Sequence, residues 1–198
     1  MPSCARPDPG ASFYRRKARL AVLLAIALVA ACTDGQEGGP FDVSGVVAHW
    51  SNGRLDGRCE LELKLAPAAR EALLNGVSLT ILLELILRNT GDQTRVATTT
   101  QRYGIRYLPL SEHYQLSGPE EGRVANFPRL RHALAQLDRP EFSLQTGALP
   151  TGDYELLVRV ELDPHSLPPP MRLPALFDAG WKHDSGWTSW PLRIASDG

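Results

Sequence analysis

Alternation of hydrophobic and polar residues is the strongest pattern in the middle of the chain. In residues 58–65 and 154–162 every second residue is apolar, and in residues 77–87 every odd position is apolar. A period of two places alternate side chains on opposite faces of a β-strand, so each run predicts a strand with one buried face. Leu82 and Ile86 add apolar side chains to the other face of the middle run, which predicts a central strand.

Shorter β patterns extend this prediction to both sides of the three clear runs. The Asn52-Gly53 pair is typical of a hairpin turn because both residues tolerate positive φ. Gly104 lies inside a segment rich in Thr and Tyr, where an isolated glycine suggests a β-bulge. The additional predicted strands are residues 42–50, 94–107, 113–116 and 124–127. Near the C-terminus, a closing strand is predicted from the alternation of Trp190, Leu192 and Ile194.

Two short helices interrupt the strands. Residues 66–74 have a proline in the first turn and an Asn-Gly stop, and residues 130–137 have apolar residues at helical spacing. Five prolines in residues 164–174 predict a shaped loop or a short helical turn. The pattern predicts a mainly β fold, a two-layer antiparallel β-sandwich of immunoglobulin-like proportions with two short helices. The alternative is an α+β sheet with both helices on one face.

The beginning of the chain has the composition of an export signal. A basic segment, residues 15–19, precedes an apolar segment, residues 20–31, which ends at Cys32. The apolar segment is shorter than the roughly 20 residues that a spanning helix needs. It resembles a bacterial lipoprotein signal, in which the cysteine is acylated and becomes the first mature residue. The alternative is ordinary secretion, because Val29 and Ala31 also fit the small-x-small cleavage rule.

These features predict three parts: a lipoprotein-type signal peptide at residues 1–31, a flexible tether at residues 32–40, and a single β-rich domain at residues 41–195. The tether contains three glycines and no large apolar residue. We expect a periplasm-facing protein, anchored through Cys32 to the outer membrane because Thr33 stands where an aspartate would favour inner-membrane retention. Without acylation, the domain would be soluble in the periplasm.

Charge and cysteine content limit the possible partners. The first 31 residues contain five of the 21 basic residues and one of the 22 acidic residues, so the remainder has a net charge of −5. An acidic domain repels a phosphate backbone, and we therefore expect no nucleic-acid partner. Cys59 has no cysteine left to pair with in the mature chain, and it alternates with leucines, which predicts an inert buried thiol.

The sequence contains no motif for catalysis, metal or cofactor binding. His183, Asp184 and Ser185 are consecutive, but neighbouring side chains in an extended segment point apart and no nucleophile elbow surrounds the serine. The five histidines lack the spacing of a preformed metal pair, and no glycine-rich phosphate cradle follows a strand. We therefore expect a protein that is not an enzyme and needs no cofactor or metal.

The order and spacing of four segments resemble a known family. They are Leu74-Asn75-Gly76-Val77-x-Leu79, Tyr103-x-x-x-Tyr107-x-x-Leu110-Ser111-x-x-Tyr114, Val160-x-Leu162-Asp163 followed by Leu167-Pro168, and Trp187-x-x-Trp190-Pro191-Leu192. The chain resembles the proteobacterial domain-of-unknown-function family 4390. The resemblance implies an exported, envelope-associated domain without an assigned activity, encoded near a membrane sensor kinase of the nitrogen-regulation type. It implies no catalytic residues.

Aromatic residues supply the candidate binding surface. Trp181, Trp187, Tyr107 and Tyr114 combine a large apolar area with a polar group, which suits contact with a protein or a sugar ring. The leading hypothesis is a non-enzymatic envelope lipoprotein that binds another envelope protein through a sheet edge or its C-terminal loops, with a link to sensor-kinase signalling. The alternatives are a glycan or peptidoglycan binding module and, last, an envelope hydrolase. The sequence leaves open whether a small-molecule ligand binds.

Overall fold

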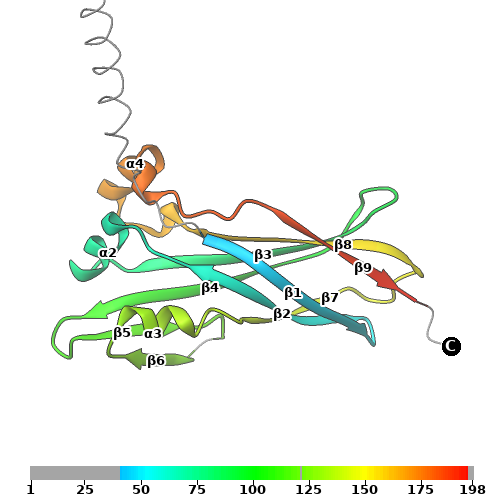
Figure 1. The fold of residues 1–198 in the computed structure, drawn as a ribbon, viewed down its shortest axis with the longest axis horizontal. Coiled ribbons are helices and arrows are strands. Elements are labelled where there is room, and N and C mark those ends of the chain that lie inside the picture. The colour runs from blue at the N-terminus through cyan, green and yellow to red at the C-terminus, as the bar shows by residue number, and fades with distance from the viewer. Residues whose placement is uncertain (1–40, 121, 196–198) are drawn as a thin grey trace, which may run out of the picture. The chain divides into compact units, whose positions relative to one another are not determined.

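Nine β-strands form two antiparallel sheets in the computed structural model, which describes residues 41–120 and 122–195 (Figure 1). The smaller sheet contains β1 (Phe41–Ser51), β2 (Arg54–Leu63) and β7 (Glu141–Gln145), in the order β1-β2-β7. The larger sheet contains β3 (Leu79–Asn89), β4 (Arg95–Leu108), β5 (His113–Ser117), β6 (Val124–Phe127), β8 (Gly152–Leu162) and β9 (Thr188–Ile194). Its order is β6-β5-β4-β3-β8-β9.

The two sheets enclose a core made of the alternating apolar residues. Leu83 and Leu85 of β3 and Val158 of β8 are fully buried in the larger sheet, as are Leu55 and Cys59 in the smaller one. The two-layer antiparallel sandwich that the alternation predicts is therefore confirmed, and β3 is an interior strand between β4 and β8. The Asn52-Gly53 hairpin is also present, with φ values of 52° and 75°.

Short helical segments complete the domain. The α-helices are α2 (Pro67–Leu74), α3 (Leu130–Ala135) and α4 (Pro169–Phe177), and the 3₁₀ turns are η1 (Pro164–Ser166) and η2 (Ala179–Trp181). The first two α-helices match the predicted pair. The third occupies the proline-rich segment, where prolines at the start of a helix cost no hydrogen bond because the first N–H groups have no intrahelical partner.

Two details of the sheets differ from the sequence prediction. Gly104 is not a bulge, because it pairs in continuous register with Thr80 and Ser117. Glycine is needed there for a close approach: a Cβ atom would lie 2.5 Å from Oγ of Ser117. Strand β7 was not predicted, although Phe142 and Leu144 alternate with polar residues and are both buried.

The helices α2 and α4 lie at the end of the sandwich where β1 begins (Figure 1). No helix in the described part of the chain is long and apolar enough to cross a membrane. The predicted signal at residues 1–31, the tether at residues 32–40 and the acylation of Cys32 all lie outside the described residues.

Candidate binding site

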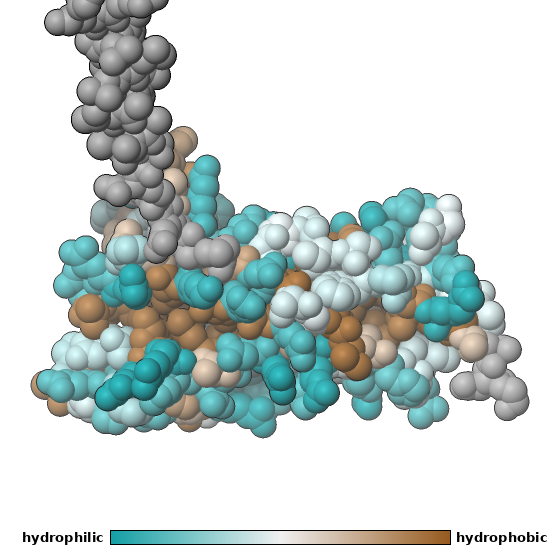
Figure 2. Space-filling view, in the orientation of Figure 1, coloured by the Kyte–Doolittle hydropathy of each residue, from teal (hydrophilic) through white to brown (hydrophobic). Residues whose placement is uncertain are grey.

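An open groove of about 500 Å³ lies between α2, α3 and the end of β2. In Figure 2, hydrophobic residues gather in the gap between these two helices. Five leucines and one tyrosine provide the apolar lining: Leu63, Leu65, Leu74, Leu130, Leu134 and Tyr114. An apolar groove that is open to solvent on a folded domain is typical of a binding site.

Local sequence explains why this groove stays open. Helix α2 buries Ala69, Ala72 and Leu73 against the core, while Leu74 is left exposed at its end. Gly76 then ends the helix with a φ of 85°, a conformation that favours glycine, and the chain turns into β3 before anything covers Leu74. Helix α3 has only six residues, so it covers one side of the gap and leaves the other side accessible.

The rim of the groove is basic although the domain as a whole is acidic. Lys64, Arg70 and Arg131 line it, against Asp138 alone. Within the described residues, neither Arg70 nor Arg131 forms an ion pair, whereas Lys64 reaches Glu62 at 4.0 Å. Burial raises the pKa of the Asp138 carboxyl, an effect that Arg139 opposes. The groove therefore offers apolar contacts together with two unneutralised guanidinium groups.

Two of the four predicted aromatic residues form a pair beside this groove. Tyr107 and Tyr114 are register partners in β4 and β5, and their ring centroids are 5.0 Å apart at an angle of 48°. Burial, with a smaller contribution from Tyr107, raises the pKa of the Tyr114 hydroxyl. Tyr114 lines the groove, so the structure associates this member of the predicted surface with the leucines and arginines that the sequence did not reveal.

The two tryptophans of the predicted surface lie elsewhere. Trp181 is half-buried in η2, packed against the core, and Trp187 is 45% exposed just before β9. Strands β3 and β8 separate β9 from the strand that holds Tyr107, so the four aromatic residues do not form one platform. Trp190 packs its side chain against the core, as its alternation with Leu192 and Ile194 predicts.

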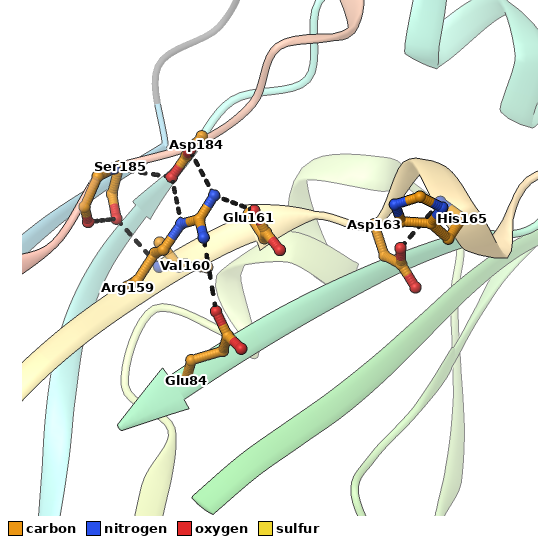
Figure 3. Close-up of polar contacts among 9 residues, drawn as sticks. Glu84, Arg159, Val160, Glu161, Asp163, His165, Asp184 and Ser185 are labelled. Atoms are coloured by element: carbon orange, nitrogen blue, oxygen red, sulfur yellow. Dashed lines mark hydrogen bonds and ion pairs between the residues drawn. The ribbon is translucent and has the colours of Figure 1, made fainter. Parts of the chain in front are cut away.

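Arg159 on the larger sheet lies at the centre of a network of charges (Figure 3). Arg159 donates two hydrogen bonds to the Asp184 carboxylate, at 2.9 and 2.7 Å, and also contacts Glu84 and Glu161. Its guanidinium lies 5.9 Å from the centroid of the Trp187 ring. These contacts join β3, β8 and the segment before β9, next to the exposed Trp187.

The environment of Arg159 shifts the pKa values of two neighbouring carboxylates in opposite directions. The Arg159 hydrogen bonds hold the pKa of Asp184 below its usual value. Burial raises the pKa of Glu161, against the attraction of Arg159 and with added repulsion from Glu84. In the described part of the chain, no group of three or more acidic, histidine or cysteine side chains has the geometry to hold a metal ion. Arg159 itself occupies the position between the carboxylates.

The three consecutive residues His183, Asp184 and Ser185 do not converge on one point. His183 is buried, and its Nε2 accepts a hydrogen bond from the Ala66 N–H at 2.8 Å. Asp184 binds Arg159, and Oγ of Ser185 accepts from the Val160 N–H and donates to the Gly186 carbonyl. The expectation that these side chains point apart is confirmed, and His183 is buried in the domain.

Cys59 has the environment expected of an inert thiol. It is fully buried in β2, and burial raises the pKa of its thiol to about 12. A thiol with such a pKa is almost entirely protonated at neutral pH, and the thiolate is the reactive form. Cys59 therefore belongs to the core of the domain.

The described residues form a two-layer β-sandwich with an apolar, basic-rimmed groove between α2 and α3. The chain belongs to the family described as Domain of unknown function (DUF4390), whose model matches residues 40–191. The match covers almost all of the described sandwich, and it agrees with the resemblance seen in the sequence motifs. No curated protein and no solved structure matches the chain.

Proposed function

We propose that this protein is a non-enzymatic lipoprotein of the cell envelope that binds another envelope protein in the groove between α2 and α3. The observation that carries the proposal is the combination of five leucines and Tyr114 with Arg70 and Arg131, whose guanidinium groups have no ion-pair partner among the described residues. Apolar contacts supply affinity, and charges at the rim supply orientation and selectivity.

The chemistry of the groove favours an amphipathic segment with acidic residues as its occupant. Such a segment places apolar side chains on the leucines and carboxylates next to Arg70 and Arg131. Arginine suits this role because its planar guanidinium pairs with a carboxylate through two hydrogen bonds. The partner class that we propose is a membrane or periplasmic protein, and the sensor kinase implied by the family resemblance is one candidate.

Export and acylation of Cys32 place the domain next to such a partner. The basic and apolar segments before Cys32 support this location, with residues 32–40 as the tether. We propose the outer membrane as the site of the anchor. A Cys32→Ser variant tests this part separately, because the protein would leave the membrane fraction and its mature mass would lack the lipid.

Charge reversal at the groove tests the binding proposal. The full chain carrying an affinity tag is crosslinked in its native cells and purified from the envelope. We expect one specific protein to be captured, and the capture to fall at least tenfold in an Arg70→Glu, Arg131→Glu double variant because each reversal replaces attraction by repulsion. Arg95→Glu is the control: it reverses an exposed arginine at the start of β4, away from the groove. It is compared with the Arg70→Glu and Arg131→Glu single variants, which change the net charge by the same amount.

Two results would contradict the binding proposal. One is a captured protein that remains at the same level in the double variant. The other is an equal loss in the Arg95→Glu control, which would reflect the change in net charge rather than the groove. Circular dichroism of each variant verifies that the β-sandwich is intact.

Exposed Trp187 favours glycan binding as a second candidate function. The Arg159 guanidinium lies 5.9 Å from the centroid of its ring and pairs with the carboxylates of Asp184 and Glu161, and sugars bind proteins through aromatic faces with polar neighbours. Tryptophan fluorescence during titration with soluble peptidoglycan fragments tests this alternative. A saturable shift that disappears in Trp187→Ala would support it, and an unchanged spectrum would remove it.

A further inference from the structure

Helix α4 presents an apolar face that no part of the described chain covers. Leu173 is 68% exposed, Leu176 is 43% exposed and Phe177 is 84% exposed. Their spacing places them on one side of the helix, while Met171 and Ala175 face the core on the other side. Isolated exposed leucines are ordinary, but three neighbouring large apolar side chains on one short helix mark a contact surface.

The helix lies at the end of the sandwich where the chain enters the domain. Residues of α4 contact η2, and His183, two residues after η2, places its ring 5.2 Å from the ring of Phe41. Figure 1 shows α4 at the end of the sandwich where β1 begins. The nine residues 32–40 can span at most about 30 Å when extended, so an anchor at Cys32 would keep this end of the domain close to the membrane.

The charged residues near α4 suit contact with a lipid surface. Between Pro164 and Lys182, the charged residues are Arg172 and Lys182 against Asp178, which contrasts with the acidic domain as a whole. Bacterial membranes carry anionic lipids, and basic residues near an apolar helical face strengthen binding to them. Half-buried Trp181 follows the helix, and tryptophan is enriched at the depth of lipid headgroups.

We infer that the apolar face of α4 inserts into the headgroup region of the membrane that carries the anchor, so that the domain rests on the lipid surface by this end. The inference rests on the proposed acylation of Cys32. It adds a second contact with the membrane and leaves the groove between α2 and α3 available to a partner protein.

An environment-sensitive label at position 177 tests the inference. The mature chain, residues 32–198, with Cys32→Ser and Phe177→Cys is labelled with nitrobenzoxadiazole, and buried Cys59 does not react in the folded protein. A histidine tag placed directly before residue 32 holds the chain on vesicles of phosphatidylethanolamine, phosphatidylglycerol and a nickel-chelating lipid, so recruitment does not depend on acylation. We expect at least a twofold rise in fluorescence with a blue shift, because the label leaves water for the bilayer.

Val47→Cys is the control, because Val47 is an exposed apolar residue of β1 in the smaller sheet and does not belong to α4. We expect its label to stay in water on the same vesicles. An unchanged label at position 177, or an equal change at both positions, would overturn the inference. A change at position 177 that rises with protein concentration in the absence of vesicles would also overturn it, since a second copy of the chain would then cover the helix. None of these results depends on the partner protein.

Discussion

His183 shows how a single residue couples folding to pH. Its Nε2 accepts the Ala66 N–H, so the ring proton of the neutral form is on Nδ1 and the protonated ring could no longer accept this bond. Its ring also contacts Phe41, which ties α2, β1 and the segment before β9 together. Burial lowers the pKa of His183 below its ordinary value of about 6.5.

Because the pKa of His183 is lowered by folding, the folded state becomes less stable in acid. The unfolded chain binds a proton at about pH 6.5, while the folded chain resists it, so the stabilisation is complete above that pH and is lost as the pH falls toward the folded pKa. We expect urea unfolding of the wild type to show this loss below about pH 6.5. In His183→Gln, whose side-chain oxygen can still accept the Ala66 N–H without titrating, the slope with pH should decrease. Parallel pH profiles for the two proteins would contradict the assignment.

The burial of His183 could not be predicted from its local sequence. It stands in a polar stretch, and its contacts come from Phe41 and Ala66, which are both more than 100 residues away in the chain. Cys59 was predictable because its own strand alternates, and alternation carries the information on which face is buried. Local pattern thus revealed burial within a strand and missed burial created by a long-range contact.

Among the elements, strand β8 carries Arg159, whose side chain adds contacts with Glu84 of β3 and with Asp184 in the segment before β9. The Arg159 side chain is 27% exposed and faces three carboxylates, whereas Arg193, 81% exposed, forms a simple surface pair with Asp153. Removal of Arg159 would leave Glu84, Glu161 and Asp184 repelling one another at a partly buried site.

We expect Arg159→Met to lower the free energy of unfolding by roughly 2 kcal/mol at pH 7. The loss should be smaller at pH 5, because without the arginine a partial protonation of the neighbouring carboxylates relieves their repulsion. Arg193→Met serves as the control and should cost less than about 1 kcal/mol, as is typical of exposed ion pairs. Equal losses for the two variants, measured by urea denaturation, would contradict the role of Arg159.

Long alternating patterns gave the clearest strand predictions, but short strands were not predicted equally well. β3 and β8 have eleven residues each, and both were predicted, as were the short strands β5 and β6. β7 was missed although Phe142 and Leu144 alternate with polar residues, and it is recognised as a strand by its pairing with β2. α4 was left between loop and helical turn because its prolines are compatible with both, and contacts with η1 and η2 decide the outcome.

For the whole molecule, the most informative feature is the uneven distribution of charge and apolar surface. An acidic domain has a basic, leucine-lined groove between α2 and α3 and a second apolar surface on α4. The sequence indicated Tyr114 but not the groove, because its two helices are separated by more than 50 residues and meet only after the sheets have formed. The function that we propose therefore depends on tertiary structure more than on any motif.

Site-specific photocrosslinking from the groove tests the central claim most directly. A photoreactive amino acid replaces Leu74, which is exposed in the groove, or Val47, which is exposed on β1. After irradiation of living cells, mass spectrometry identifies the joined peptides. We expect position 74, and not position 47, to capture one envelope protein through an apolar segment containing acidic residues. Capture of the same peptides from both positions, or of no protein from position 74, would contradict the account.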